Sequence, residues 1–287
     1  MIRFSIIIPL YNKANFVRKS IDSVLNQTYK DFEIIVVNDG STDNSLSVVN
    51  EINDDRIRVF SKENEGVAIA RNFGIEKSQN EYIAFLDADD LWLPDFLETI
   101  IEMIGQYPHA GVFATGSTSI DRMGNKIELV NNSLTKGTVL FIDNYCKALI
   151  NKEMAHIWTG AICAKRELFD SIGGFREGIK RGEDLDMWLR LSLVSPVVWK
   201  NEAKAIYYTV TENNATQNYS SYKDDFPYWE WYTYSPSIYQ KIHAHRAIKH
   251  TLKRLNYRNK ICLLTKINWY YVWLHLLYHL GHNKDKQ

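Results

Sequence analysis

The first hundred residues alternate between short apolar runs and longer stretches whose apolar residues have helical spacing. Residues 4–8 and 32–37 are almost continuously apolar, the pattern of strands buried on both faces. Four such strand–helix units in succession predict a parallel sheet with right-handed crossovers, flanked by helices. The expected elements alternate strand and helix over residues 4–8, 15–27, 32–37, 44–52, 57–60, 66–75, 82–86 and 94–104.

The remainder of the chain is less regular. Residues 105–160 show no clear period, residues 164–172 read as a helix ended by Gly173-Gly174, and residues 185–194 read as a second helix. With 287 residues and 45% apolar content, the chain can form one large α/β domain or a domain with an appendage.

Polar clusters follow three of the expected strands, at residues 9–12, 38–43 and 87–90. The carboxyl ends of parallel strands meet at one edge of a sheet, where α/β proteins bind ligands. We therefore expect the three clusters to converge and to form a functional site.

Three carboxylates, Asp87, Asp89 and Asp90, end the strand at 82–86. Asp87 and Asp89 are two residues apart and would point to the same side of a strand, where a hard divalent cation could join them to a phosphate. The alternative is an acidic turn that caps the next element. Convergence with the other clusters favours the metal–phosphate interpretation for Asp87 and Asp89, and leaves Asp90 to cap or orient the turn before Pro94.

Each of the other candidate residues also has a structural alternative. Asp39 could accept hydrogen bonds from a nucleobase or ribose, or could form an Asp-Gly turn. Arg71 could meet a phosphate or base, or could be exposed on a helix that packs closely on the sheet. Glu183 and Asp184 could supply a general base, or could serve as ordinary acidic residues at a helix N-terminus.

Several common catalytic motifs are missing from the sequence. There is no Gly-x-x-x-x-Gly-Lys-Ser/Thr loop, no Gly-x-Gly-x-x-Gly after the first strand and no Gly-x-Ser-x-Gly. P-loop ATPase and dinucleotide oxidoreductase chemistry are therefore disfavoured.

Taken in order, the motifs resemble glycosyltransferase family 2, which consists of inverting enzymes with the GT-A fold. The resemblance covers about residues 3–210. The matching motifs are Ser5-Ile6-Ile7-Ile8-Pro9-Leu10-Tyr11-Asn12, Val37-Asn38-Asp39-Gly40-Ser41-Thr42-Asp43, Asn64-Glu65-Gly66-Val67-Ala68 with Ala70-Arg71-Asn72, Phe85-Leu86-Asp87-Ala88-Asp89-Asp90, Gly173-Gly174-Phe175, and Glu183-Asp184 with Trp188.

The resemblance implies a role for each candidate residue. Asp89, together with Asp87, would bind Mg²⁺ or Mn²⁺, Asp184 would be the catalytic base, and Glu183 is its partner in the Glu-Asp motif. The residues that would bind the nucleotide-sugar are Pro9, Tyr11, Asp39, Asn64, Arg71, Asp87 and Ala88.

The implied reaction is metal-dependent, inverting transfer of a sugar from a nucleoside-diphosphate sugar to an acceptor hydroxyl. UDP is the commonest donor nucleotide of the family, and the transferred unit would be a hexosyl or N-acetylhexosaminyl group. The implied pathway is bacterial surface polysaccharide, capsule, O-antigen or lipopolysaccharide synthesis. The chain lacks the Gln-x-x-Arg-Trp motif of processive synthases, which favours addition of single sugars.

Two other functions remain as alternatives. A sugar-phosphate nucleotidyltransferase would keep the fold, but residues 9–14 lack the Gly-rich, Arg-containing loop of those enzymes. An inactive nucleotide-sugar-binding module would not need Asp87, Asp89 and Asp184. No nucleic-acid partner is expected.

The C-terminal part differs sharply in charge. Residues 231–284 carry nine lysines and arginines, no acid and six of the eight histidines. We expect a GT-A catalytic domain over 1–220, with a nucleotide-sugar half at about 1–105 and an acceptor half at about 106–220, and a basic, aromatic helical extension over 221–287. Aromatic residues that could stack on sugars, or could simply pack, are Tyr219, Tyr222, Tyr228, Trp229 and Trp231.

Residues 261–280 of this extension are expected to form an apolar, aromatic helix interrupted by polar side chains, beside a basic stretch. Such a helix suits an anionic membrane surface, although it could instead pack against the acidic catalytic domain. Three cysteines without metal or redox spacing indicate reduced thiols. We therefore expect a cytoplasmic enzyme, peripheral at the inner face of the cytoplasmic membrane, with a glycan or lipid-linked glycan acceptor.

Overall fold

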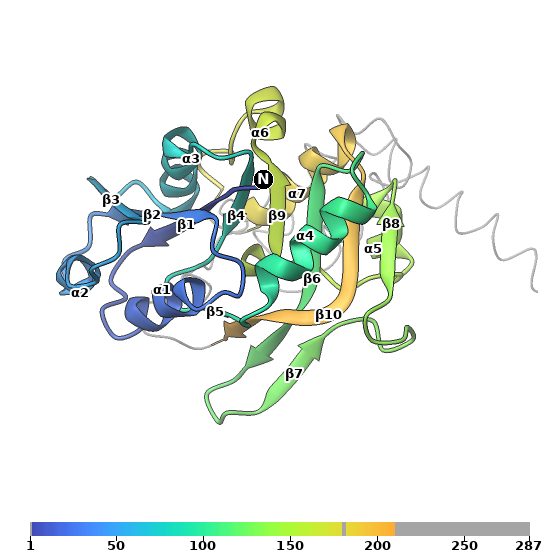
Figure 1. Cartoon of the computed structure of the whole chain (residues 1–287), viewed down its shortest axis with the longest axis horizontal. Coiled ribbons are helices and arrows are strands. Elements are labelled where there is room, and N and C mark those ends of the chain that lie inside the picture. The colour runs from blue at the N-terminus through green and yellow to red at the C-terminus, as the bar shows by residue number, and fades with distance from the viewer. Residues whose placement is uncertain (1, 180–181, 210–287) are drawn as a thin grey trace, which may run out of the picture.

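The computed structural model describes residues 2–179 and 182–209, and its centre is a single large sheet (Figure 1). The strand order is β3-β2-β1-β4-β9-β6-β10-β5, with β7 paired to β6 and β8 paired to β10. The strands are β1 (Phe4–Leu10), β2 (Phe32–Asp39), β3 (Ile57–Lys62), β4 (Tyr82–Phe85), β5 (Leu91–Trp92), β6 (Val112–Ile120), β7 (Lys126–Leu129), β8 (Val139–Ile142), β9 (Ile162–Lys165) and β10 (Val197–Tyr208).

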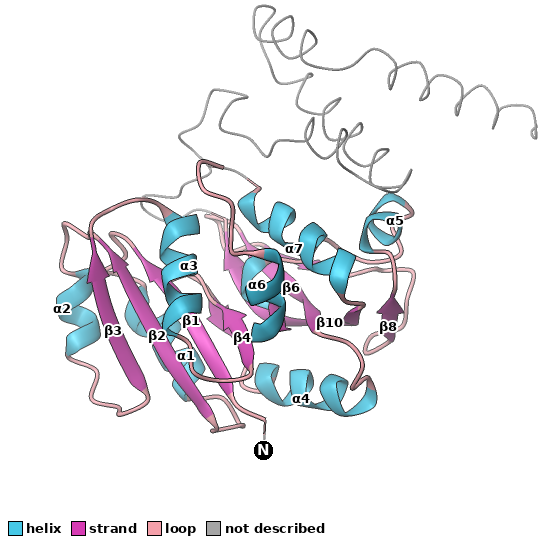
Figure 2. Cartoon of the chain, turned by 90° about the horizontal axis from the view of Figure 1, so that it is seen from above, coloured by secondary structure: helices cyan, strands magenta, loops and turns pink. Residues whose placement is uncertain are grey.

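Helices cover both faces of this sheet. In Figure 1, α1 and α4 lie in front of the sheet, and in Figure 2, α3, α6 and α7 lie together along the other face. The helices are α1 (Val17–Leu25), α2 (Ser45–Asn50), α3 (Val67–Lys77), α4 (Phe96–Gln106), α5 (Tyr145–Ile150), α6 (Arg166–Ile172) and α7 (Glu183–Val194), with a short 3₁₀ turn, η1 (Thr159–Ala161).

The N-terminal half has the predicted parallel arrangement. Strands β3, β2, β1 and β4 are neighbours and run parallel, with Ile7 opposite both Ile35 of β2 and Phe85 of β4. The eight expected strands and helices up to α4 begin and end within two residues of the expected bounds, and the short strand β5 was not expected. The α/β class expected from the sequence is confirmed.

Successive side chains of the buried strands pack on opposite helix layers. Ile7 and Phe85 belong to a core cluster with Phe169 of α6 and Trp188 of α7. Ile6 and Ile8 belong to a second cluster with helices α1 and α4. Because neighbouring residues of a strand face opposite sides, a strand covered on both faces must be apolar throughout, as β1 is.

The second half of the sheet is mixed rather than parallel. β6 and β10 are parallel to each other, but β9 runs antiparallel to both β4 and β6, and β5, β7 and β8 are antiparallel to their neighbours. The helix expected at residues 164–172 was wrong at its start, because Ala164 and Lys165 belong to β9 and α6 begins at Arg166. Pairing with β4 and β6 therefore overrides the local helical spacing at these two positions.

The tail predicted over residues 221–287 lies outside the described residues, so its helix, its membrane contact and its sugar-stacking aromatics stay predictions. Within residues 2–179 and 182–209, none of the helices has both the length and the apolar character needed to cross a bilayer.

Close packing of α3 on β1 generates a stability prediction. A Cβ added at Gly74 of α3 would lie 2.4 Å from Ile7 Cγ2, inside the buried core. We expect Gly74→Ala to lower the free energy of unfolding by about 1–3 kcal/mol, because the helix must shift away from the sheet. Urea unfolding followed by circular dichroism measures this change.

The matched control is Gly105→Ala, near the exposed end of α4. A Cβ there meets nothing within 4 Å, so alanine should be neutral or stabilising by up to about 1 kcal/mol through its higher helix propensity. Equal effects of the two substitutions would contradict the close packing at Gly74.

Candidate active site

A cavity of about 810 Å³ opens where β1, β2 and β4 end and where α3 and α7 begin. It brings together every site residue predicted from the sequence, although these residues are spread over most of the described chain. The predicted residues that line it are Pro9, Tyr11, Asp39, Asn64, Arg71, Asp87, Ala88, Asp89, Glu183 and Asp184.

One end of the cavity is formed by the loops that follow β1 and β2. These loops are tied together, because Asn12 Oδ1 accepts hydrogen bonds from the backbone N–H of Thr42 at 2.8 Å and of Asp43 at 3.3 Å. Tyr11, with 43% of its surface exposed, lies at the rim. An exposed aromatic ring beside polar backbone offers a face on which a planar group can stack.

Asp39 is buried at the end of β2 and holds the start of α3. Its carboxylate accepts from the backbone N–H of Gly66 at 2.8 Å and of Glu65 at 3.1 Å, and from Lys62 Nζ at 2.9 Å. Asp39 therefore organises the loop before α3, and because it also lines the cavity, its nucleotide-binding role stays a prediction.

The turn that follows Asp39 requires glycine. Gly40 has a φ of +69°, and a Cβ at this position would lie 2.8 Å from the backbone nitrogen of Asn64. Only glycine fits this left-handed turn against the neighbouring loop. The close approach brings Asn64 to the same end of the cavity as Asp39.

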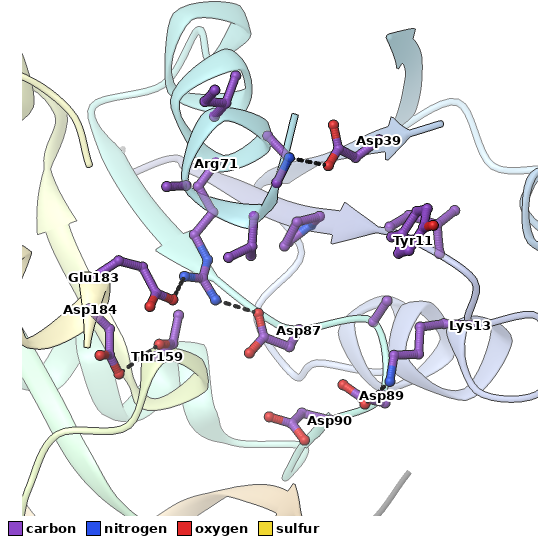
Figure 3. Close-up of a pocket in the computed structure, with 18 of the residues that line it drawn as sticks. Tyr11, Lys13, Asp39, Arg71, Asp87, Asp89, Asp90, Thr159, Glu183 and Asp184 are labelled. Atoms are coloured by element: carbon purple, nitrogen blue, oxygen red, sulfur yellow. Dashed lines mark hydrogen bonds and ion pairs between the residues drawn. The ribbon is translucent and has the colours of Figure 1, made fainter. Parts of the chain in front are cut away.

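The centre of the site is the guanidinium of Arg71, which is only 2% exposed. Its Nη2 donates to Asp87 Oδ1 and its Nη1 donates to Glu183 Oε1, both at 2.8 Å (Figure 3). Its Cζ also lies 5.3 Å from the centre of the Phe175 ring. The alternative of an exposed Arg71 is wrong, because the side chain joins the first predicted metal ligand to the Glu-Asp motif.

These two carboxylates control the charge of Arg71. Burial alone lowers the pKa of the Arg71 guanidinium, but the negative charges of Asp87 and Glu183 outweigh burial and leave the pKa above its usual value. Arg71 is therefore a permanent cation, fixed between two elements that are far apart in the sequence.

The three acidic residues after β4 have three different partners. Asp87 pairs with Arg71, and Asp89 Oδ2 lies 2.6 Å from Lys13 Nζ. Asp90 is buried and accepts from Trp158 Nε1 at 2.9 Å and from the backbone N–H of Tyr208 at 3.2 Å. Asp90 does not cap α4, but its carboxyl group ties the acidic turn to Trp158 and to β10, so it orients the turn before Pro94 as expected.

The environment of Asp90 also changes the pKa of its carboxyl group. Burial raises the pKa of Asp90 well above its usual value, and the neighbouring charges of Asp87 and Asp89 raise it further.

Glu183 and Asp184 open α7 at the opposite end of the cavity from the β2 loop, with Gly182 in a left-handed conformation before them. Asp184 accepts from the backbone N–H of Leu185 at 2.7 Å and, at 3.4 Å, from Thr159 Oγ1. The helix-terminal position predicted for the pair is confirmed, and the helix dipole favours negative charge there. Both side chains also line the cavity, and the general-base role stays a prediction.

Outside the family motifs, sequence reasoning missed five polar or aromatic residues that line the cavity, namely Lys13, Trp158, Thr159, Tyr207 and Tyr208. The Trp158 and Tyr207 rings form a close pair with centroids 3.8 Å apart. Trp158 and Thr159 lie near the end of the irregular segment, and the two tyrosines lie at the end of β10. No motif spacing marks any of the five, and only the pairing of β10 with β6 and β5 brings the tyrosines to the cavity.

Comparison with known families matches this combination of fold and site. The model of glycosyl transferase family 2 matches residues 5–172, which is more than half of the chain. The chain belongs to glycosyl transferase family 2. The matched region includes β1 to α6 but ends before the Glu183-Asp184 pair.

The first curated relatives are larger than this chain. An uncharacterized glycosyltransferase of Rickettsia bellii is 38% identical over 193 residues, which are 66% of this chain and 26% of the relative. A chondroitin synthase of Pasteurella multocida is 34% identical over 215 residues, which are 74% of this chain and 21% of the synthase. The chain spans between 26% and 32% of the length of the first curated relatives.

A solved structure supports the fold. S. aureus TarS 1-349 in complex with UDP-GlcNAc superposes with a TM-score of 0.66 over 81% of this chain and 64% of TarS, at 19% identity. The GT-A fold expected from the sequence is confirmed by this similarity.

A metal site in this cavity would be built from the acidic turn. Within residues 2–179 and 182–209, no group of three or more histidine, cysteine or acidic side chains is arranged to hold a metal ion. Asp87 and Asp89 do line the same cavity, and Mg²⁺ usually takes one or two protein carboxylates and completes its shell with phosphate oxygens and water. The residues therefore fit a cation that binds together with a diphosphate.

The site also generates a pH prediction for Glu183. Burial raises the pKa of Glu183 and the charge of Asp184 raises it further, while Arg71 lowers it, and the net pKa lies above the usual 4.5. The folded protein then keeps this proton to a higher pH than the unfolded chain does, so the contribution of Glu183 to stability falls as pH rises above 4.5.

Glu183→Gln removes this contribution and keeps an oxygen for Arg71. The unfolding free energy of the variant, minus that of the wild type, should therefore rise as pH increases from 4.5 to neutrality. Urea unfolding across this range tests the sign, with Glu177→Gln, which removes an exposed carboxylate, as the matched control. A difference that falls with pH would show that Arg71 dominates and that the pKa of Glu183 is lowered.

Proposed function

We propose that this chain is a metal-dependent, inverting glycosyltransferase that transfers a sugar from a nucleoside-diphosphate sugar to an acceptor hydroxyl. The observation that carries the proposal is the common cavity of Asp87, Asp89 and Asp184, in which Arg71 joins the two acidic elements. Membership of glycosyl transferase family 2 supports the same reaction class.

The donor binds, in this proposal, along the edge formed by β1, β2 and α3. Pro9, Tyr11, Asp39 and Asn64 surround the nucleoside, and Ala88 lies beside the diphosphate. UDP is the proposed nucleotide, because TarS, which shares the fold, forms complexes with UDP and UDP-GlcNAc. A hexosyl or N-acetylhexosaminyl group is the proposed transferred unit.

Asp87 and Asp89 would hold Mg²⁺ or Mn²⁺ against the diphosphate. When bound, the cation supplies positive charge that offsets the charge developing on the departing nucleoside diphosphate. Arg71 acts indirectly. Its guanidinium donates to both Asp87 and Glu183, which keeps Asp87 oriented and fixes the position of Asp87 relative to α7. The side chain of Arg71 therefore positions the diphosphate site through Asp87.

Asp184 is the proposed general base. The acceptor oxygen attacks the anomeric carbon while the bond from that carbon to the diphosphate oxygen breaks, and the acceptor proton moves to the Asp184 carboxylate. The transition state has oxocarbenium character, as in other glycosyl transfers, and attack opposite the leaving group inverts the anomeric centre. Thr159 Oγ1 and the N–H of Leu185 orient the carboxylate for this step.

The acceptor side of the cavity, in the same proposal, includes the aromatic pair Trp158 and Tyr207. Aromatic rings pack well against the apolar face of a sugar ring, and Trp158 immediately precedes the threonine that contacts Asp184. This arrangement suits a glycan acceptor, free or lipid-linked.

The proposed pathway is bacterial surface polysaccharide, capsule or lipopolysaccharide synthesis. It is supported by relatives named chondroitin synthase and hyaluronan synthase in Pasteurella multocida, each 34% identical to this chain. A peripheral position at the inner face of the cytoplasmic membrane is also proposed, and it rests on the basic, aromatic composition of residues 221–287.

Asp184→Asn tests the general base. We expect turnover to fall by about 10²–10⁴-fold while donor affinity stays near the wild-type value, because the base acts on the acceptor. The measurement is release of nucleoside diphosphate from a panel of nucleotide-sugars in the presence of Mn²⁺ or Mg²⁺, with donor affinity from calorimetry. The matched control is Asp170→Asn, which neutralises an exposed acid on α6. Full turnover by Asp184→Asn would remove Asp184 from the reaction.

Asp89→Asn tests the metal role. Wild-type protein should bind UDP more tightly with Mn²⁺ than in EDTA, whereas the variant should bind UDP equally in both conditions, because the cation has lost a ligand. Calorimetry in matched buffers measures the four affinities, and Asp143→Asn, which neutralises an exposed acid near β8, is the control. If Mn²⁺ strengthens UDP binding by the variant as much as by the wild type, Asp89 does not hold the cation.

A further inference from the structure

A lysine occupies the position where the proposed function requires a cation. Lys13 Nζ lies 2.6 Å from Asp89 Oδ2, and both side chains are largely buried, with 11% and 15% of their surfaces exposed (Figure 3). Both residues line the cavity beside Asp87. No motif of the sequence singled out Lys13.

The backbone of Lys13 is fixed independently of Asp89. Its N–H donates to Ser45 Oγ at 2.7 Å, and the neighbouring Ala14 N–H donates to Asp43 Oδ2 at 3.1 Å. The loop after β1 thus presents the lysine from a rigid base. Only the flexible four-carbon stem of the side chain has to turn for the ammonium to move by several ångströms.

The charges around the acidic turn explain why a cation lies there. Asp87 has Arg71 as its partner, whereas Asp89 faces Lys13 from the other side of the turn. An ammonium within hydrogen-bond distance of a partly buried carboxylate is attracted more strongly than it would be in bulk water. The ammonium and a divalent cation therefore compete for the Asp89 carboxylate.

We propose that Lys13 is the resident counter-ion of Asp89, that a divalent cation binds Asp89 only by displacing the Lys13 ammonium, and that the displaced ammonium then binds the donor diphosphate. The proposal rests on the assignment of the cation to Asp89 in the proposed function.

The exchange makes cation binding depend on the nucleotide. With the cation alone, displacement leaves the Lys13 ammonium without its carboxylate, so binding is weakened. When a diphosphate arrives with the cation, the ammonium exchanges a carboxylate oxygen for a phosphate oxygen, which lysine binds well as a point charge. The site therefore favours the cation–diphosphate pair over the cation alone.

Mn²⁺ without nucleotide is the first probe. Titration of free Mn²⁺, followed by its electron paramagnetic resonance signal, should give a dissociation constant about tenfold lower for Lys13→Gln than for the wild type, equivalent to about 1.4 kcal/mol. Lys13→Arg keeps the competing charge and should stay close to the wild type. Lys136→Gln removes the same charge from a side chain that is 75% exposed and outside the cavity, and is the matched control.

UDP in the presence of EDTA is the second probe. Because Lys13 then supplies the positive charge nearest to Asp89, Lys13→Gln should bind UDP about tenfold more weakly than the wild type, whereas Lys136→Gln should not change. Thermal unfolding of each variant confirms that the protein is folded, and Lys13→Arg provides a charged variant if Lys13→Gln is unstable.

The outcomes separate this inference from the proposed function. If Asp89→Asn loses Mn²⁺ but Lys13→Gln binds Mn²⁺ no more tightly than the wild type, the counter-ion role is overturned and the metal role of Asp89 stands. If Lys13→Gln binds UDP in EDTA as well as the wild type, the transfer of the ammonium to the diphosphate is overturned. If Asp89→Asn binds Mn²⁺ as the wild type does, the metal assignment fails and the counter-ion inference fails with it.

Discussion

The buried guanidinium of Arg71 is the interaction on which the candidate site depends. It lies on α3, yet its two hydrogen-bonded partners are Asp87 at the end of β4 and Glu183 at the start of α7. A buried charge is tolerated only when it is paired, and the loss of one partner from such a pair costs about 3–5 kcal/mol. The same contacts that satisfy Arg71 therefore fix the distance between the acidic turn and the helix that carries Asp184.

Each acidic cluster of the cavity has a lysine or an arginine beside it. Lys62 pairs with Asp39, Lys13 with Asp89, and Arg71 with Asp87 and Glu183. These cations differ in how easily they can leave. Arg71 donates to two carboxylates through a planar guanidinium that is almost fully buried, whereas the Lys13 ammonium that contacts Asp89 is at the end of a flexible four-carbon stem. A cation or phosphate that enters the cavity can therefore exchange partners with Lys13 far more easily than with Arg71.

The sequence predicted the nucleotide half of the fold well because its strands are buried on both faces. The apolar run that includes Ile6, Ile7 and Ile8 is continuous and stops at a polar cluster. Both ends of the strand can therefore be predicted without knowing its tertiary contacts. The site residues were also predictable, since their strand ends and helix starts are local features.

The second half was not predictable in the same way. In β6, the apolar residues Val112 and Phe113 give way to a polar end that pairs with β7, and Ala164 has helical neighbours but pairs in β9. These segments are strands because they pair with the strands beside them. The partners of Arg71 and Lys13 could not be predicted for a similar reason. An ion pair formed across the sheet edge leaves no regular spacing in the sequence.

Asp90 links the acidic turn to the side of the cavity opposite Arg71. Asp87 reaches α7 through Arg71, while Asp90, three residues later, reaches η1 and β10 through Trp158 and Tyr208. A single turn of four residues thus holds both the helix that carries Asp184 and the aromatic pair of Trp158 and Tyr207. Because a turn of this length has little freedom to deform, a shift of Asp87 would also move the two hydrogen-bond partners of Asp90, Trp158 and Tyr208. The acidic turn is therefore the element through which the two ends of the cavity can respond to each other.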